Sequence, residues 1–246
     1  MAEAEYRTNI LVRVLGDIIW YITQLSVFEV LFYHAPQIAG WNIHSMRVFM
    51  GVLFISDACY MILFHDNFEH ASASVRKGEL DFVMLKPINS QFMFSCRKVN
   101  AVYLINLGIV ICYLTWALGK LPALPGVTAF LGTFLLMIAG LIVLYSLRFF
   151  FAGLNVILTN ASSLTYVWYQ FYRLGNRPHA LYPPWLRWIV LTIFPVGLIV
   201  SVPATNLVQG TDSYFVWASP VVAGLLLWLS SKYWNYILRF YSSASS

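Results

Sequence analysis

Long apolar segments alternate with short polar ones along most of this chain. A helix needs about 20 consecutive apolar residues to cross the hydrocarbon core of a bilayer, and six segments approach that length. They lie, in chain order, at residues 18–33, 46–64, 99–118, 127–147, 151–172 and 214–231. The pattern predicts an all-α integral membrane protein with six transmembrane helices, in which residues 1–246 form a single membrane domain.

The segment at 151–172 is apolar enough to cross, but it also carries a series of polar side chains. We single out Asn155, Asn160 and Ser163 as candidates for lining a pathway. Polar residues inside a membrane segment face protein or water rather than lipid. Hydrogen bonding between helices is the commoner use of such residues, so both roles stay open at this point.

Prolines interrupt the apolar stretch that precedes the last predicted span. Pro195 and Pro203 each remove a backbone donor that lipid cannot replace. We therefore expect residues 184–210 to form a re-entrant segment on the outer side. An alternative topology exchanges the two roles, with 151–172 along the cytoplasmic surface and 188–208 as the crossing segment.

A short stretch that contains two charged residues, residues 9–17, precedes the first span. Arg13 and Asp17 stand four residues apart, on one face of a helix. The stretch predicts an N-terminal interfacial helix that lies in the headgroup plane with its charges in water. An ordinary span with a solvated end accounts for the same pattern equally well.

Composition narrows the class of protein further. Hydrophobic residues make up 60% of the chain and charged residues 10%, which leaves no stretch for a separate soluble domain. The three cysteines are an odd number, and the five histidines show no ligand spacing. We expect no metal site, no catalytic residues, no bound cofactor and no nucleic-acid partner.

The one long polar stretch, residues 66–98, lies between the second and third predicted spans. With the N-terminus inside, ten Lys and Arg residues fall on the cytoplasmic side, this stretch included, and five fall outside. The positive-inside rule thus favours cytoplasmic N- and C-termini. The alternative topology gives thirteen against two, and the two prolines in its required crossing segment argue against it.

Asp57 is the acid that lies deepest in a predicted span. An unpaired charge at that depth costs a few kcal/mol on insertion scales, so it must face a cavity or a partner, or be protonated. Asp57 is therefore our best single candidate for a translocation path. A hydrogen-bonded acid that holds helices together is the equally weighted alternative. Glu29, near the outer end of the first span, is expected to reach the interface.

Several short motifs resemble the ABC-2 type exporter permeases, in particular a small bacterial branch of that superfamily. They are Leu181–Ile189 (LYPPWLRWI) with the later Pro195, Lys77–Asp81 (KGELD), Leu85–Pro87 (LKP) and the ending Leu238–Ala244 (LRFYSSA). Each motif is short, and their order and spacing along nearly the whole chain carry the resemblance.

The resemblance implies a permease that depends on a separate ABC ATPase, expected in two copies and supplying the sites for ATP and Mg²⁺. No G-x-x-x-x-G-K-[ST] motif occurs in this chain. It also implies a second permease subunit, identical or paralogous, in a bacterial cytoplasmic (inner) membrane. The ATPase is expected to contact residues 66–80, within the loop 66–98, through Asp66, Glu69, Arg76, Lys77, Gly78, Glu79 and Leu80. The apolar block within 81–87 is expected to pack against a neighbouring subunit or the membrane.

Three other interpretations of the sequence stay open. The loop 66–98 could be solvated, with charges that only set the topology. The chain could be a proton-coupled secondary carrier that uses Asp57, although it shows no internal repeat of the kind found in such carriers. It could also be a membrane scaffold that transports nothing.

Overall fold

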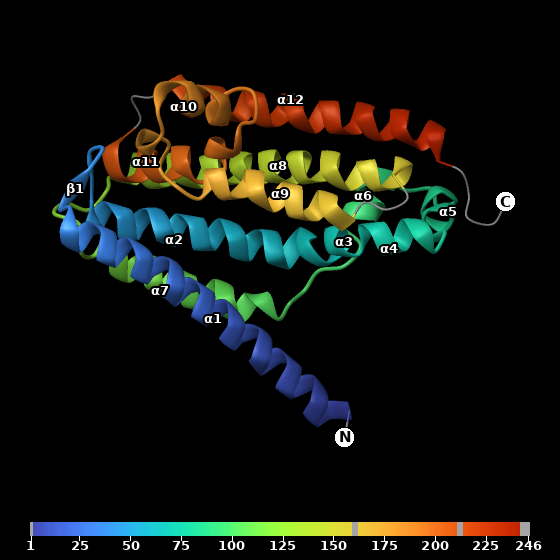
Figure 1. The fold of residues 1–246 in the computed structure, drawn as a ribbon, viewed down its shortest axis with the longest axis horizontal. Helices are drawn as coiled ribbons and strands as arrows, with labels where there is room; N and C mark the ends of the chain where they lie inside the picture. The colour runs from blue at the N-terminus through green and yellow to red at the C-terminus, as the bar shows by residue number, and fades with distance from the viewer. Residues whose placement is uncertain (1, 159–161, 211–213, 242–246) are drawn as a thin grey trace.

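The computed structural model describes residues 2–158, 162–210 and 214–241, and nearly all of them are helical (Figure 1). The long helices are α1 (Ala2–His34), α2 (Ile43–Tyr60), α7 (Tyr103–Leu118), α8 (Val127–Ile157), α9 (Ser162–Gly175) and α12 (Tyr214–Ile237). Shorter ones are η1 (Met61–His65), α3 (Asp66–Glu69), α4 (Ala71–Arg76), α5 (Glu79–Met84), α6 (Ser90–Ser95), η2 (His179–Leu181), α10 (Pro184–Leu191), η3 (Val196–Leu198), α11 (Ser201–Gln209) and η4 (Leu238–Phe240). Strands β1 (Gln37–Ile38) and β2 (Trp41–Asn42) form an antiparallel hairpin.

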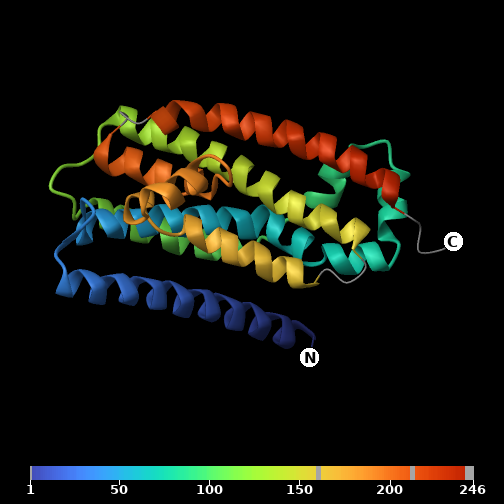
Figure 2. The same ribbon diagram turned by 45° about the horizontal axis from the view of Figure 1, so that its top comes forward.

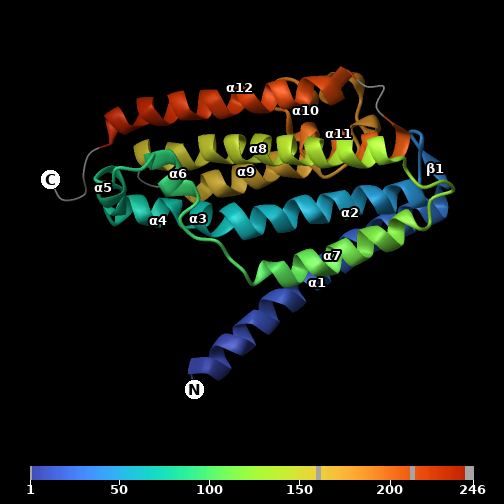
Figure 3. The same cartoon turned by 180° about the vertical axis from the view of Figure 1, so that it is seen from behind.

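Successive long helices run in alternating directions along one bundle (Figures 1 and 3). Helices α1, α7 and α9 point toward the end that carries the β-hairpin, which we call the β1 end. Helices α2, α8 and α12 point the other way. Residues 66–98, which include α3 to α6, gather at the opposite end beside the end of α12, and we call them the α3–α6 cap. The prediction of an all-α membrane protein is confirmed.

Four helical stretches within the described residues are long and apolar enough to cross a membrane: Ile10–His34, Ile43–Val75, Val127–Leu154 and Tyr214–Phe240. They cover the segments predicted at 18–33, 46–64, 127–147 and 214–231. The segment predicted at 99–118 becomes a shorter apolar helix, because α7 begins only at Tyr103.

The segment predicted at 151–172 does not form one helix. Helix α8 continues through Ile157, where Leu158 takes an extended conformation, and α9 begins at Ser162. At 1.5 Å per residue, the 14 residues of α9 cover about 21 Å. Helix α9 runs alongside α2 and α8 (Figure 2), and Trp168 is buried against Phe151 with ring centroids 5.6 Å apart. Helix α9 therefore packs against the other helices of the bundle.

The N-terminal residues do not form a separate interfacial helix. Helix α1 is continuous over 33 residues, because no proline breaks the stretch between residue 9 and the first span. The amide of Asn106, on α7, donates a hydrogen bond to the carboxylate of Asp17. Asp17 is thus tied to a neighbouring helix rather than turned to water with Arg13. Toward its N-terminus, α1 leaves the bundle (Figures 1 and 3).

Residues 66–98 form a folded cap rather than an extended loop. The π-helical turn η1 joins α2 to α3, and α4 follows directly, so the chain is helical over most of 43–76. Gly78 begins the turn into α5 with a φ of +70°, a conformation that residues with a Cβ disfavour. The side chain of Asn89 then caps α6 by accepting a hydrogen bond from the amide of Phe92 at 3.1 Å.

Residues 184–210 fold as a hairpin of short helices, so 188–208 does not form one continuous helix. A Cβ on Gly140 would lie 2.7 Å from the carbonyl oxygen of Ile199. Gly140 is 13 residues into α8, about 20 Å along its axis. The chain then returns toward the β1 end. There, the Asn206 side chain donates to the carbonyl of Ala129 at 3.1 Å, near the start of α8.

Candidate functional site

A cavity of about 610 Å³ lies between α1, α2 and α9. Its volume falls within the range of small-molecule sites in proteins. Polar and aromatic side chains from all three helices line it. They are Asp17, Trp20, Gln24 and Phe28 from α1, Asp57 from α2, and Tyr166, Tyr169, Gln170, Tyr172 and Arg173 from α9, with Asn176 and Arg177 just beyond.

Asp57 lines this cavity, as its isolation in an apolar span led us to expect. The hydroxyl of Tyr172 donates to its carboxylate at 3.5 Å. Tyr172 is itself held by stacking on Trp168, with ring centroids 5.8 Å apart. Among the described residues, the Asp57 carboxylate has no ion-pair partner. The structure thus places an acid without a cationic partner on the wall of a cavity.

Sequence reasoning missed three charged residues that line the same cavity. Asp17 was interpreted as a surface charge because Arg13 stands one helical turn away. Arg173 and Arg177 were among the five basic residues counted on the outer side, and α9 carries the first of them into the cavity. Only the amphipathic pattern of α9 signals this arrangement.

The other predicted pathway residues give no support for lining the cavity. Asn160 and the side chain of Asn155 lie outside the described residues. Ser163 is exposed at the start of α9 and is not among the cavity-lining residues. Glu29, also singled out from the sequence, forms a two-pronged ion pair with Arg47 at 2.6 and 2.9 Å.

Several residues predicted to contact an ATPase also have partners within the chain. The carboxylate of Asp66 accepts from the Asn100 side chain at 2.8 Å. Glu79 accepts from Ser74 at 3.1 Å and pairs with Arg97 at 3.7 Å. Leu80 is buried, and Gly78 makes the turn described above. Lys77 is exposed, and the side chain of Arg76 lies outside the described residues.

The outer surface of the cap carries exposed apolar side chains next to basic ones. Phe82 is 70% exposed and Leu85 81% exposed, whereas Leu80 and Val83 turn inward to the core. This split follows from helical spacing on α5, which places Leu80 and Val83 on one face. Lys77 and Lys86 are exposed on either side of α5.

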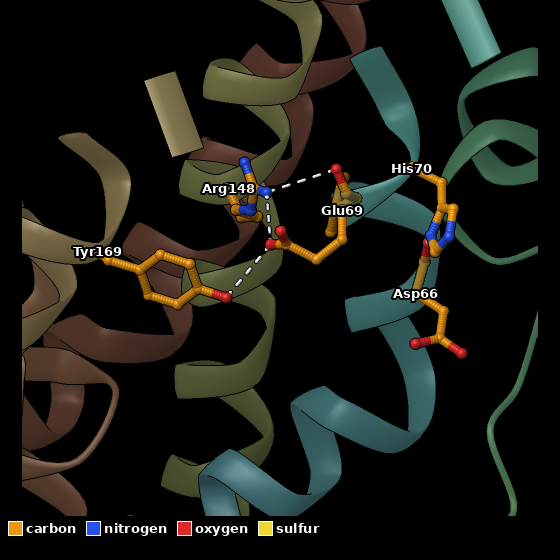
Figure 4. Close-up of polar contacts among 6 residues, drawn as sticks. Asp66, Glu69, His70, Arg148 and Tyr169 are labelled. Atoms are coloured by element: carbon orange, nitrogen blue, oxygen red, sulfur yellow. Dashed lines mark hydrogen bonds and ion pairs between the residues drawn. The ribbon is translucent and has the colours of Figure 1, made fainter. Parts of the chain in front are cut away.

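Glu69 joins the cap to the cavity (Figure 4). Its carboxylate accepts from the Arg148 guanidinium at 3.1 Å and from the Tyr169 hydroxyl at 3.2 Å. Arg148 also donates to the carbonyl of Phe68 at 3.4 Å, and its guanidinium lies 5.5 Å from the centre of the Phe68 ring. Since Tyr169 lines the cavity, the carboxylate of Glu69 on α3 connects the cap to α8 and to the cavity wall on α9. We call Glu69, Arg148 and Tyr169 together the Glu69 link.

The structure gives Glu69 and Arg148 partners that the sequence did not reveal. Glu69, which was predicted to contact an ATPase, has its carboxylate bonded within the bundle. Arg148 directly follows the span predicted at 127–147, yet it is fully buried and α8 continues for nine residues beyond it. Burial of an arginine requires a counter-charge and hydrogen-bond acceptors, and Glu69 and the Phe68 carbonyl supply them.

At the β1 end, the motif around Trp185 has a structural role. The guanidinium of Arg187 donates to the carbonyls of His179, Ala180 and Tyr182, at 3.1, 3.0 and 3.4 Å. The His179 ring lies 2.7 Å from the Ser201 hydroxyl. Burial and the nearby positive charge of Arg187 lower the pKa of His179 to about 4. These contacts hold the two arms of the 184–210 hairpin together.

Comparison with protein families adds one match. A family model described as "ABC-2 family transporter protein" matches residues 18–245. Comparisons with curated proteins and with solved structures find no match. The match includes the α3–α6 cap, the hairpin and all of the cavity-lining residues except Asp17.

Proposed function

Because the chain belongs to the ABC-2 transporter family, we propose that it is the permease subunit of an ATP-driven exporter. Members of this family are membrane transport components without their own nucleotide-binding domain, and the family implies association with an ABC ATPase. In our proposal, two ATPase copies bind ATP and Mg²⁺, and this chain forms the path with a second permease subunit, identical or paralogous.

The proposed topology has six crossings in the cytoplasmic membrane of a bacterium, with both chain ends inside. The alternating directions of α1, α2, α7, α8, α9 and α12 support this count (Figure 1). The depth that Ile199 reaches beside Gly140, and the return of Asn206 to Ala129, support a re-entrant hairpin on the outer side. The positive-inside rule favours the α3–α6 cap as the cytoplasmic end.

The cavity between α1, α2 and α9 is the proposed part of the path in this subunit. It presents Asp17 and Asp57 together with Arg173 and Arg177. Charged side chains within membrane segments are costly, and they typically mark substrate or ion pathways. Export would require this cavity to change its exposure from one side of the membrane to the other.

The single observation that carries the proposal is the Glu69 link. An ATPase that moves the cap would move α3, and Glu69 on α3 is bonded to Tyr169 on the cavity wall. Arg148 anchors the same carboxylate to α8. Closure of the two ATPases on ATP would thus reach the cavity through a short chain of charge-assisted hydrogen bonds.

The proposed docking surface is the exposed face of the cap around Lys77, Phe82, Leu85 and Lys86. Leu80 is buried and Glu69 is bonded within the bundle, so we assign the ATPase contact to their exposed neighbours. An exposed aromatic anchor flanked by charges is the kind of surface that protein partners bind. The occupant we propose is the ATPase, because the cap lies at the end of the bundle that carries the excess of basic residues.

A co-purification experiment tests the docking surface. The tagged chain is isolated from native membranes, and its partners are labelled with a photoreactive azido-ATP. We expect a labelled ATPase with the wild type and its loss with Lys77→Glu combined with Phe82→Asp. The control combines Lys120→Glu with Leu124→Asp, two similarly exposed positions at the β1 end. Equal recovery of the ATPase with both variants would refute the docking surface.

The second candidate function is a proton-coupled carrier, which the cavity-facing Asp57 favours. In a carrier, Asp57→Asn would abolish transport that is driven by a pH gradient in vesicles without ATP. In an ATP-driven permease, wild-type vesicles show no such transport, and ATP supplied on the cytoplasmic side is required. The presence or absence of a labelled ATPase in the purified complex separates the two candidates independently.

A further inference from the structure

The cavity between α1, α2 and α9 carries opposite charges in equal number. Among the described residues that line it, the charged ones are Asp17, Asp57, Arg173 and Arg177. None of the ion pairs found in the described part of the chain includes any of them. The acids and bases of this wall therefore do not neutralise one another by direct contact, and they remain available to a molecule in the cavity.

Asp57 and the two bases lie at different levels of the bundle. Asp57 stands three residues before the end of α2, which points away from the β1 end (Figure 1). The Tyr172 hydroxyl that donates to Asp57 marks the same level on α9. Helix α9 points toward the β1 end, so Arg173 follows Tyr172 in that direction, and Arg177 lies two residues beyond the end of the helix. The bases therefore begin on the β1 side of the Asp57 level.

Asp57 is the acid with the larger unused capacity for hydrogen bonds. Within the described ranges, only the Tyr172 hydroxyl donates to its carboxylate, and 3.5 Å is long for such a bond. Asp17, in contrast, accepts a hydrogen bond from the Asn106 amide, and Arg13 stands one helical turn before it. An ionised carboxylate can accept several hydrogen bonds. A cationic N–H group of a ligand therefore fits beside Asp57.

The two arginines offer the complementary half of a binding site. Arg173 and Arg177 are exposed, and neither has a carboxylate partner in the part of the chain that the structure describes. A guanidinium group presents a planar fork of donors that matches a carboxylate or a phosphate. An anionic group of a ligand therefore fits on this side of the cavity.

Aromatic side chains supply much of the remaining wall. Trp20 and Phe28 come from α1, and Tyr166 and Tyr169 come from α9. Phe28 follows Trp20 by eight residues, about 12 Å along the helix axis. Such rings bury apolar surface, and their faces attract cations. The cavity thus has room for an apolar body as well as for two opposite charges.

Resting on the proposed role of this cavity as the translocation path, we infer that the substrate is a zwitterionic molecule with an apolar body, as in a short peptide. Its ammonium group lies beside Asp57, and its anionic group lies beside Arg173 and Arg177. A molecule with only a positive charge would meet two arginines without a counter-charge. A molecule with only a negative charge would meet two acids in the same way. Repulsion of both kinds selects a molecule that carries both charges.

Three matched probes test this specificity on the purified full chain in nanodiscs, without ATP and without an ATPase. The dipeptide Phe-Leu is zwitterionic at neutral pH, its C-terminal amide is only cationic, and its N-acetyl form is only anionic. Isothermal titration calorimetry measures the Kd of each probe. We expect Phe-Leu to bind about tenfold more tightly than either derivative, as expected for one additional hydrogen bond between charged groups.

Variants separate the two halves of the site. Asp57→Asn should remove the preference for Phe-Leu over its N-acetyl form and leave the preference over the amide. Arg173→Gln combined with Arg177→Gln should have the reverse effect. Lys120→Gln, at an exposed base of the β1 end, is the control and should change neither preference. Size-exclusion chromatography identifies any variant that folds poorly, and the comparison of the three probes on the unmodified chain does not depend on the variants.

Equal affinities for the three probes, tighter binding of either derivative, or no binding of any probe would overturn the inferred specificity. Loss of the proposed exporter function has a different signature. A complex purified from native membranes without an ATPase would contradict that function, whereas the relative affinities of the three probes would not change. The two failures are therefore distinguishable.

Discussion

Arg148 and Glu69 form an ion pair of 3.1 Å across 79 residues of chain. The guanidinium is almost fully buried, and the carboxylate is partly exposed. The pair places the first turn of the α3–α6 cap against α8, 21 residues after the start of that helix. It also leaves the same carboxylate oxygen bonded to Tyr169, on the wall of the cavity that contains Asp57.

Removal of the buried charge should destabilise the protein strongly. Arg148→Met leaves the Glu69 carboxylate without its counter-charge, and such losses cost about 3 kcal/mol. The double variant Arg148→Met with Glu69→Gln should recover part of this loss, because no unpaired charge remains. Thermal unfolding of the purified protein in detergent, followed by size-exclusion chromatography, measures both. A single variant as stable as the wild type would contradict the assigned pairing.

The hairpin should depend on the absence of a side chain at Gly175. A Cβ there would lie 2.7 Å from the carbonyl oxygen of Val196, which is backbone and cannot turn aside. Gly175→Ala should therefore destabilise the protein by about 1–3 kcal/mol through overpacking. Gly224→Ala is the matched control, because a Cβ at Gly224 meets nothing within 4 Å. Equal thermal stability of the two variants would show that α9 does not pack against the hairpin this closely.

The stability of the protein should depend on pH through the titration of His179. The folded protein holds the pKa of His179 at about 4, whereas an unfolded chain has a histidine pKa of about 6.5. Between these values the unfolded state binds a proton that the folded state does not. The free energy of unfolding should therefore fall as the pH drops from about 6.5 to 4. His179→Gln should remove this part of the pH dependence in unfolding measurements across that range, and an unchanged pH profile would contradict the assignment.

Apolar periodicity predicted the helices whose membrane segments are uniformly apolar. The segments at 46–64, 127–147 and 214–231 all lie in long helical stretches. Periodicity failed at 151–172, because no proline separates α8 from α9 and the polar residues around their junction were compatible with the polar side of one crossing helix. It failed at residues 9–17 for a related reason, because a local pair of charges resembled a surface helix.

The candidate site was predictable only in part. Asp57 stood out because a lone acid in an apolar span has a high energetic cost. The Glu69 link could not be read from the sequence, because its members are far apart in the chain and each has an ordinary local explanation. Glu69 stood among the residues expected to contact an ATPase, Arg148 directly after the span predicted at 127–147, and Tyr169 within the segment predicted at 151–172.

The most direct test of ATP-driven movement uses a reporter inside the cavity. Gln24→Cys, in a chain with Cys59, Cys96 and Cys112 replaced by serine, is labelled with a membrane-impermeant maleimide in the purified complex reconstituted into vesicles. We predict that a non-hydrolysable ATP analogue changes the labelling rate at Gln24→Cys, and that Tyr169→Phe abolishes the change while the ATPase still co-purifies. An unchanged labelling rate in a complex that contains the ATPase would contradict the central claim that ATP binding changes the exposure of this cavity.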